Sequence, residues 1–254
     1  MSKKARKQSR NVKHLKSVPA PQHDNTFQVK QKWHPLDAEI DNARDKKYVK
    51  NIKPRTQGQA DLMQAIQDYN LTMAMGPAGT GKTYLAVCAA VEALEKGEVD
   101  RIILSRPAME AGESLGYLPG AMEEKMAPYL RPLFDALGDR LGGKRVRQYM
   151  DEGTIEIAPV GFMRGRTLNN AFVVIDEAQN CTYIQLKMLL SRLGWHSTMV
   201  VTGDPAQSDL LTGMSGLSEI SQKLKASENI AVVELQSKDI VRHPLVGEML
   251  DILD

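Results

Sequence analysis

Eight consecutive residues, 76–83, match the phosphate-binding loop (P-loop) pattern G-x-x-x-x-G-K-[ST] at every position. The glycines of this pattern let the backbone curl so that successive N–H groups point at phosphate oxygens, where a Cβ would crowd. The lysine reaches the β- and γ-phosphates, and the final hydroxyl binds Mg²⁺. The sequence therefore predicts a site for a nucleoside triphosphate and Mg²⁺ formed by Gly76, Pro77, Ala78, Gly79, Thr80, Gly81, Lys82 and Thr83.

A pair of adjacent carboxylates follows a second apolar run. Residues 171–175 (AFVVI) are predicted to form a buried strand that ends at Asp176 and Glu177. We expect Asp176 to hold Mg²⁺ through water together with Thr83, and Glu177 to polarise the attacking water. The P-loop lies about 100 residues upstream, with other strand signals between. This layout favours the branch of P-loop proteins that inserts a strand between the phosphate loop and the acidic strand and hydrolyses the nucleotide with a glutamate.

Two further polar segments are candidate nucleotide contacts. Residues 198–202 (TMVVT) indicate a strand that runs into Gly-Asp-Pro-Ala-Gln, so we expect Gln207 to sense the γ-phosphate. An ordinary Gly-Asp-Pro turn is the alternative. Arg55 and Gln59 lie in a PRTxxQ stretch shortly before the P-loop, where helicase-like ATPases often use glutamine to bind the adenine edge. The alternative for Gln59 is a surface side chain on a helix.

A parallel sheet flanked by helices is needed to position these residues. The P-loop is preceded by a run typical of a buried parallel strand (71–75) and followed by an Ala-rich helical segment (84–96) that Gly97 ends. Thr56 is predicted to cap a helix over 57–69. We predict further strands at 101–105, 154–158 and 230–235, and helices at 122–141, 182–193 and 245–253. A long irregular loop is expected at 108–120. Pro128 and Pro132 are expected to break or kink the helix over 122–141.

The composition separates two parts of the chain. Its 254 residues are 42% hydrophobic and 25% charged, which is typical of a soluble globular protein. Residues 1–55 carry 15 Lys/Arg and 5 Asp/Glu, whereas the remainder carries 18 and 26. Because residues 3–16 contain no acidic and few apolar side chains, we expect a disordered basic tail that binds phosphate backbones by charge. A tail that only stays solvated is the alternative.

Several classes of protein are disfavoured by the sequence. No apolar run approaches the roughly 18 residues of a membrane span, and no apolar segment follows the charged N-terminus as in a signal peptide. We therefore expect a cytoplasmic protein without membrane contact. Cys88 and Cys181 lack metal-ligand spacing and are expected to be reduced packing thiols. Arg106, Arg164 and Arg166, each in a loop after a predicted strand, are candidate contacts for nucleic acid.

Long stretches around these motifs are more specific than the motifs themselves. They are PRTxxQ from Pro54, GPAGTGKTYLA from Gly76, SRPAMEAGESLGYLPG from Ser105, YLRPLFDAL from Tyr129, APVGFMRGRTLNNAFVVIDEAQN from Ala158, TGDPAQSDL from Thr202 and DIVRHPLV from Asp239. On these stretches the chain resembles the PhoH family of P-loop ATPases over about residues 54–250. The resemblance implies an α/β fold with a single RecA-like core of the helicase superfamily I type in residues 54–254, hydrolysis of ATP, and a connection with RNA. Residues 1–53 match no assigned domain and are expected to be a basic, largely irregular extension.

Two functions from different classes stay open at this stage. The first is a Mg²⁺-dependent ATP-driven motor that acts on RNA or single-stranded DNA, with helicase activity as attributed to some relatives. The alternative is a regulatory or scaffold protein that is gated by nucleotide, hydrolyses it slowly and is tethered to nucleic acid by its tail. A small-molecule kinase is more distant, because Glu177 directly after Asp176 suits the activation of water.

The single core also predicts assembly. P-loop hydrolases usually complete the charge around their transition state with an arginine from a second domain or a neighbour. Arg242, Arg164 and Arg166 are the candidates for action in a neighbouring subunit, whereas we expect Arg106 near the bound strand or the γ-phosphate of its own subunit. The sequence predicts a homo-oligomer with ATP at its interfaces, and the resemblance implies a hexameric ring. The alternative is that these arginines pair with acidic groups of the core.

Overall fold

The computed structural model describes residues 52–107, 122–211 and 213–241, together with positions 245, 246, 249 and 252. The basic N-terminal segment, the predicted loop at 108–120 and Arg242 lie outside the described residues, as does most of the predicted helix over 245–253.

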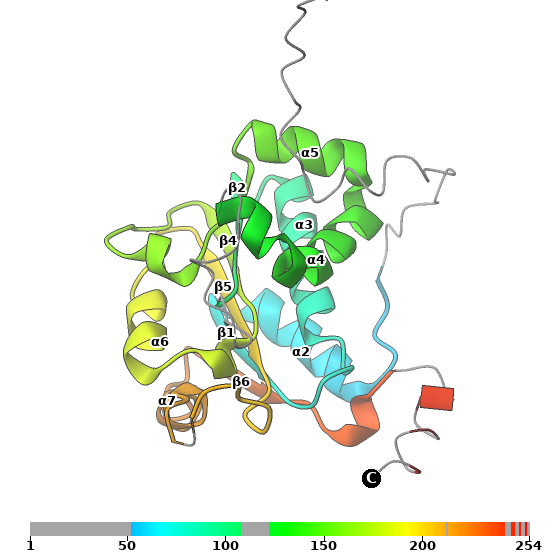
Figure 1. Cartoon of the computed structure of the whole chain (residues 1–254), viewed down its shortest axis with the longest axis vertical. Coiled ribbons are helices and arrows are strands. Elements are labelled where there is room, and N and C mark those ends of the chain that lie inside the picture. The colour runs from blue at the N-terminus through cyan, green and yellow to red at the C-terminus, as the bar shows by residue number, and fades with distance from the viewer. Residues whose placement is uncertain are drawn as a thin grey trace, which may run out of the picture. The chain divides into compact units, whose positions relative to one another are not determined.

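Within the described residues, six parallel strands form one sheet in the order β3-β2-β4-β5-β1-β6 (Figure 1). The P-loop strand β1 and the acidic strand β4 are separated by β5, with Met75 opposite Gly203 and Ile175 opposite Val201. The predicted inserted strand is thus confirmed. Because the strands are parallel, the loops that follow β1, β4 and β5 leave from the same edge of the sheet. The strands are β1 (Leu71–Met75), β2 (Arg101–Ser105), β3 (Ile155–Ile157), β4 (Ala171–Ile175), β5 (Thr198–Gly203) and β6 (Ala231–Glu234).

Helices cover both faces of the sheet. One face carries α2 (Gln57–Asp68), α3 (Lys82–Lys96), α4 (Met122–Leu141) and α5 (Gly143–Asp151), and the other carries α6 (Tyr183–Leu190) and α7 (Leu217–Leu224) (Figure 1). The predicted α/β architecture, a parallel sheet flanked by helices, is confirmed. The short helices α5 and α7 were not expected from the sequence.

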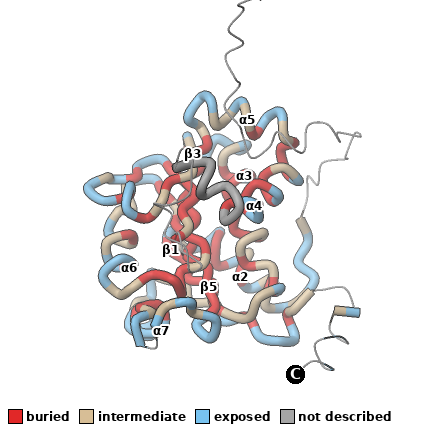
Figure 2. The backbone as a smooth tube through the Cα atoms, in the orientation of Figure 1, coloured by how far each residue is buried: buried red, intermediate tan, exposed pale blue. Residues whose placement is uncertain are grey.

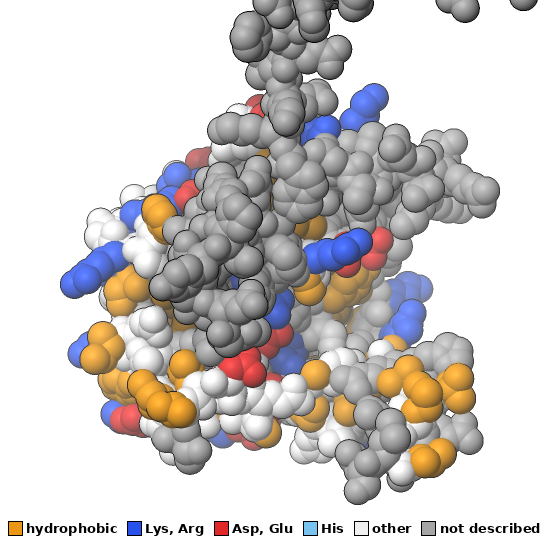
Figure 3. All heavy atoms as spheres, in the orientation of Figure 1, with side chains coloured by type: hydrophobic (Ala, Val, Ile, Leu, Met, Phe, Trp, Pro, Cys, Tyr) orange, Lys and Arg blue, Asp and Glu red, His pale blue; other side chains and the backbone are white. Residues whose placement is uncertain are grey.

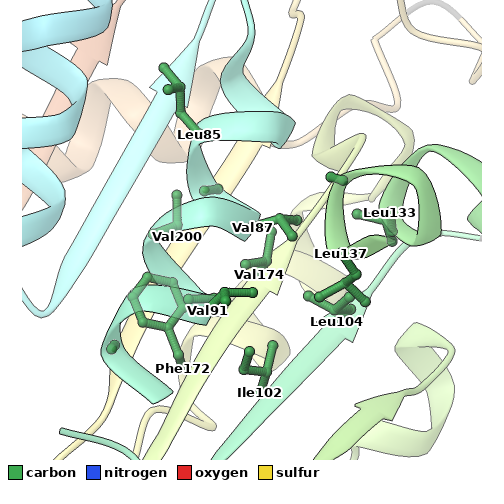
Figure 4. Packing of buried hydrophobic residues seen from close by; sticks show 14 of the residues in the cluster. Leu85, Val87, Val91, Ile102, Leu104, Leu133, Leu137, Phe172, Val174 and Val200 are labelled. Carbon is green, nitrogen blue, oxygen red and sulfur yellow. The ribbon is translucent and has the colours of Figure 1, made fainter. Parts of the chain in front are cut away.

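The hydrophobic core has two halves because successive side chains of a strand point to opposite faces. Ile102, Val174 and Val200 pack toward α3 and α4, while Ile103, Val173 and Val201 pack toward α6 and α7. The four inner strands β2, β4, β5 and β1 are buried on both faces, which explains why they read as apolar runs (Figure 2). Figure 4 shows the half of the core that packs against α3 and α4. Side chains from the two helices and the sheet meet there: Leu85, Val87 and Val91 of α3, Leu133 and Leu137 of α4, and Ile102, Leu104, Phe172, Val174 and Val200 of the sheet.

The ends of the helices follow local sequence signals. The Thr56 hydroxyl accepts a hydrogen bond from the Gln59 amide at 3.2 Å and caps α2 as predicted. Gly97, with φ 72°, ends α3 in the left-handed conformation that glycine favours. Thr182 and Gln185 form a reciprocal capping box at the start of α6.

A break at the prolines of α4, one of the two expected effects, was wrong, and a kink stays a prediction. Helix α4 runs from Met122 to Leu141 as a single element and is not broken at Pro128 or Pro132. Proline removes a helix hydrogen bond and costs about 3 kcal/mol in an isolated helix. Leu133 and Leu137, both fully buried against the core, supply packing that offsets this cost.

Two other sequence expectations concern buried thiols and membrane spans. Cys88 and Cys181 are free and buried, and burial raises the pKa of each thiol to about 12, in agreement with a packing role. Across the described part of the chain, no helix combines the length and the apolar character that crossing a membrane requires.

Candidate active site

The P-loop connects β1 to α3 through three glycines with positive φ. Gly76, Gly79 and Gly81 have φ values of 140°, 83° and 86°, which side chains with a Cβ rarely adopt. At Gly76 the requirement is also steric, because a Cβ would lie 2.3 Å from the carbonyl oxygen of Leu235. The loop can therefore curl around a phosphate only because these positions are glycine.

Neighbouring elements fasten the P-loop at three points. The Gly76 amide donates to the Gly203 carbonyl at 3.1 Å, and the Val241 amide donates to the Gly79 carbonyl at 2.9 Å. From behind, the side-chain amide of Gln59 donates to the Thr80 carbonyl at 3.0 Å. The loop is thus positioned by β5, by the segment after β6 and by α2.

The ammonium group of Lys82 folds back onto its own loop. Its Nζ donates to the carbonyl oxygens of Gly76 at 2.6 Å and Pro77 at 2.7 Å, and the residue is only 8% exposed. Burial lowers the pKa of Lys82, and nearby carboxylates, Asp204 above all, partly oppose this shift. A buried cation lies at the mouth of the loop, where a phosphate would meet it.

Asp176 lies at the centre of the site and is 2% exposed. Its Oδ1 accepts hydrogen bonds from the hydroxyls of Thr83 and Thr202, both at 2.6 Å. Its Oδ2 accepts from the Arg106 guanidinium at 3.2 Å. A hydroxyl and a carboxylate side by side are the hard oxygen ligands that Mg²⁺ takes alongside water and phosphate, so the residues present fit this ion.

Glu177 has an unusual backbone. Its φ of 52° is in the left-handed region, which a residue other than glycine enters at a cost of about 1–3 kcal/mol. Its side chain is 36% exposed, with Oε1 accepting from Arg106 at 3.3 Å and Oε2 accepting from the Gln179 amide. The carboxylate of Glu177 is therefore oriented by two side chains, next to Asp176.

These groups surround a cavity of about 400 Å³. Figure 3 shows acidic and basic side chains together near the middle of the face that it displays. The cavity extends from the P-loop to α4 and is lined by Ala78, Gly79, Gly81, Lys82, Thr83, Tyr84, Pro132, Asp135, Ala136, Asp139, Asp176, Glu177, Thr202, Gly203, Asp204 and Gln207.

A family model described as PhoH-like protein matches residues 51–254. The chain belongs to the PhoH-like family. It is 52% identical over 206 residues to the PhoH-like protein of Bacillus subtilis (strain 168), covering 81% of this chain and 65% of that protein. It is also 52% identical over 203 residues to the PhoH-like protein of Mycobacterium tuberculosis (strain ATCC 25618 / H37Rv), covering 80% of this chain and 58% of that protein. The chain thus spans less than two thirds of the length of these relatives.

A solved structure supports the fold. The large terminase of a thermophilic bacteriophage, in complex with ADP, matches with a TM-score of 0.50 and 12% identity, over 79% of this chain and 50% of that chain. At this identity the likeness concerns the arrangement of the strands and helices alone.

The fold of this PhoH-like chain brings most of the predicted site residues together. Lys82, Thr83, Asp176, Glu177 and Gln207 all line the same cavity. Thr83 and Asp176, which are 93 residues apart in the sequence, are in direct contact. Their roles in binding and hydrolysis stay predictions.

Gln59 and Arg55 lie outside the lining of this cavity. Gln59 is 6% exposed, so the alternative of a surface glutamine is wrong. Its Nε2 donates to the P-loop carbonyl of Thr80, and its Oε1 accepts from the backbone amide of Arg55 at 2.9 Å. In this structure the amide of Gln59 supports the loop, and an adenine contact stays a prediction for both residues.

The three candidate arginines for nucleic acid have different surroundings. Arg106 binds both carboxylates of the site, and its place near a γ-phosphate stays a prediction. Arg166 forms a two-pronged ion pair with Glu156, at 2.6 and 2.7 Å, and this pair lowers the pKa of Glu156. Arg166 thus follows the alternative of pairing with an acidic group, whereas Arg164 is exposed.

Sequence reasoning missed Thr202 and Gln179. Thr202 appears as one more residue of an apolar strand, and Gln179 as one letter of the Asp-Glu-Ala-Gln sequence. A signal existed for Thr202: it is the polar residue at the end of a buried strand, where ligands of a parallel sheet gather. For Gln179 no signal other than its place after Glu177 was available.

Proposed function

We propose that this chain is a Mg²⁺-dependent ATP hydrolase that is coupled to RNA or single-stranded DNA and works as a helicase-like motor. The observation that carries the proposal is the contact of the Thr83 hydroxyl with Asp176, at 2.6 Å, with Lys82 and Glu177 on the same cavity. P-loop hydrolases need this set: a phosphate cradle, a metal ligand pair and a carboxylate for the attacking water.

The chemistry follows from the positions of these groups. Thr83 and Asp176 would hold Mg²⁺, and the ion would supply positive charge that neutralises the phosphate oxygens. Lys82 exchanges its bonds to the Gly76 and Pro77 carbonyls for bonds to phosphate oxygens. Glu177 accepts the proton of a water whose oxygen attacks the γ-phosphorus. The bond from that phosphorus to the bridging oxygen breaks, and the products are ADP and phosphate.

Arg106 supports a slow basal rate and a partner that stimulates it. Its guanidinium binds the metal ligand Asp176 and the water-activating Glu177 at the same time. A cation at this position competes with Mg²⁺ for Asp176 and withholds one carboxylate oxygen of Glu177 from water. Full activity therefore requires Arg106 to move, and a bound nucleic acid is the partner that we propose to favour this movement.

The basic residues support nucleic acid as that partner. Residues 1–20 carry seven Lys/Arg, and Arg164, directly after the 3-10 helix Val160–Met163, is exposed. Such groups bind phosphate backbones with a strong dependence on salt. The same Arg106 contact also suits the alternative, a nucleotide-gated regulatory or scaffold protein with slow hydrolysis. The two functions differ in whether nucleic acid raises the rate of ATP hydrolysis.

The test is the steady-state ATPase rate with and without single-stranded RNA, single-stranded DNA and duplex DNA. The motor predicts stimulation by about 10-fold or more at low salt, with loss of the effect as salt rises. A variant that lacks residues 1–20 should keep the basal rate and need more RNA for stimulation. An unchanged rate with every nucleic acid would favour the gated regulator.

We also propose that the chain forms a homo-oligomeric ring, with six subunits as the family resemblance implies and ATP at the interfaces. Within the described residues, the cavity is lined by one lysine and no arginine. Arg106 does not line the cavity itself but contacts two carboxylates that do, Asp176 and Glu177. An arginine from a neighbour, with Arg242 and Arg164 as candidates, would complete the charge around the transition state. Mixing Lys82→Ala with Arg242→Ala subunits should restore some ATPase activity, whereas a fully active monomer in light scattering would contradict the ring.

A further inference from the structure

Gln179 lies between the water-activating carboxylate and the loop after β5. It belongs to the short 3-10 helix Ala178–Asn180 that begins directly after Glu177, and it is 3% exposed. Its Nε2 donates to Oε2 of Glu177, and its Oε1 accepts from the backbone amide of Asp204 at 3.0 Å. One side-chain amide therefore joins two loops of the site.

The direction of this amide is determined by chemistry. A backbone N–H can only donate, so the atom that faces the Asp204 amide must be the carbonyl oxygen of Gln179. The NH₂ group is then left to face the carboxylate of Glu177, which can only accept when it is ionised. An exchange of the amide oxygen and nitrogen would break both hydrogen bonds, so Gln179 has a single satisfied orientation.

The fold makes room for Gln179 at this place. A Cβ on Gly203 would lie 3.0 Å from Oε1 of Gln179 and 2.5 Å from a methyl carbon of Leu217. Gly203 therefore lets the end of β5 approach the amide closely. An ordinary residue at this position would push the Asp204 amide away from Gln179.

Other contacts join the same two loops without reaching Glu177. The Ser208 hydroxyl donates to the backbone carbonyl oxygen of Gln179 at 3.0 Å. The side chain of Asn180 donates to Asp209 at 2.8 Å and accepts from its backbone amide at 2.9 Å. Asn180 thus offers a control that loosens the loop and leaves the contact between Gln179 and Glu177 intact.

We propose that Gln179 is a positioning residue that connects the loop of residues 203–209 to the carboxylate of Glu177. Asp204 and Gln207 of this loop line the nucleotide cavity, so a γ-phosphate there acts on the loop. A shift of the Asp204 amide moves the Gln179 side chain, which in turn sets the direction of Oε2 of Glu177. The inference rests on the proposed ATP hydrolysis and adds the route by which the occupied cavity orients its base.

The variant Gln179→Glu tests this role because it keeps the size of the side chain and the acceptor for Asp204, and replaces the donor to Glu177 with a second carboxylate. We expect kcat to fall about 100-fold, in the range of a misplaced general base, with KM and the Kd for ADP within about threefold. Binding of ADP with aluminium fluoride, which needs an oriented water, should weaken by a similar factor. The control Asn180→Ala should keep kcat within about threefold.

Thermal unfolding shows whether each variant folds, and Gln179→Met, which removes the amide but keeps the length, replaces Gln179→Glu if the latter does not. A kcat near that of the intact chain in the folded Gln179 variant would overturn the inference, as would an equal loss in Asn180→Ala. A parallel rise of KM and the Kd for ADP would also overturn it, because it indicates general damage to the cavity. If the intact chain hydrolyses no ATP, the proposed function fails first and the inference falls with it.

Discussion

In the P-loop, the Lys82 ammonium contacts carbonyl groups five and six residues away along the chain, whereas in the carboxylate centre Asp176 contacts Thr83, Arg106 and Thr202, which are 93, 70 and 26 residues away. The cation is thus held by its own loop. Asp176 is held by three other segments, namely the start of α3, the residue after β2 and the end of β5. The difference implies that substitution of Lys82 acts mainly on binding of the ligand, while substitutions around Asp176 act on both the ligand and the fold.

The largest expected effect belongs to Lys82→Ala. Loss of this cation removes a charge that stabilises the phosphates in the transition state, so we expect ATP hydrolysis to fall about 1,000-fold or more. Because the contacts of Lys82 are within its own loop, the midpoint of unfolding without nucleotide should change little. Lys96→Ala, an exposed lysine at the end of α3, is the control. Unfolding of the Lys82 variant would contradict the idea of a locally held cation.

Arg106→Ala should have the next largest effect, which is a loss of stability. Its removal leaves the buried Asp176 without its ionic partner, which we expect to cost about 1–3 kcal/mol of unfolding free energy in the presence of EDTA. Mg²⁺ should restore part of this loss, because the ion can take the place of the guanidinium. Urea unfolding with EDTA and with Mg²⁺ measures both quantities.

Arg145→Ala, at an exposed ion pair with Glu95, should cost less than about 1 kcal/mol and should show no added response to Mg²⁺. An Arg106 variant that responds to Mg²⁺ no more than the intact chain would break the link between Arg106 and the metal ligands.

Sequence reasoning reached the P-loop and the acidic strand because their signals are local. The glycine spacing and the apolar run before Asp176 each lie within one short segment, and the parallel topology follows from alternating strands and helices. It did not reach Thr202 or Gln179, because their roles depend on β5 lying next to β4. The unbroken helix α4 has a similar cause, since tertiary packing overrides the local signal of its two prolines.

Thr202→Val tests a single hydrogen bond to Asp176 and should have a smaller effect. The substitution keeps the shape of a buried side chain and removes one of the two hydroxyl donors to Oδ1 of Asp176, so we expect a loss of about 1 kcal/mol in unfolding free energy. Thr72→Val, on the neighbouring strand β1, removes a hydroxyl that donates to the Ala65 carbonyl at 3.2 Å. Both variants should lose similar stability, but only Thr202→Val should weaken binding of Mg²⁺-nucleotide.

The smallest effect concerns Asp239, which connects the segment after β6 to the start of α2. The Asp239 carboxylate accepts hydrogen bonds from the Gln236 amide, the Thr56 hydroxyl and the Gly58 amide, and these bonds lower its pKa. The stability that this group contributes is therefore present above the ordinary aspartate pKa of about 4 and is lost as the pH falls through its lowered value. In Tm measurements from pH 5 to pH 2.5, Asp239→Asn should lose less stability on acidification than the intact chain. Equal changes of Tm with pH in the two proteins would show that the contacts of Asp239 do not depend on its charge.

Glu177→Gln tests whether Glu177 is the general base in the proposed hydrolysis of ATP. ATP binding and single-turnover hydrolysis are measured on the same samples in the presence of Mg²⁺. We expect the variant to bind ATP within about threefold of the intact chain and to hydrolyse it at least about 100-fold more slowly, because the amide cannot accept the proton of water. Turnover of ATP by Glu177→Gln at the rate of the intact chain would contradict the account.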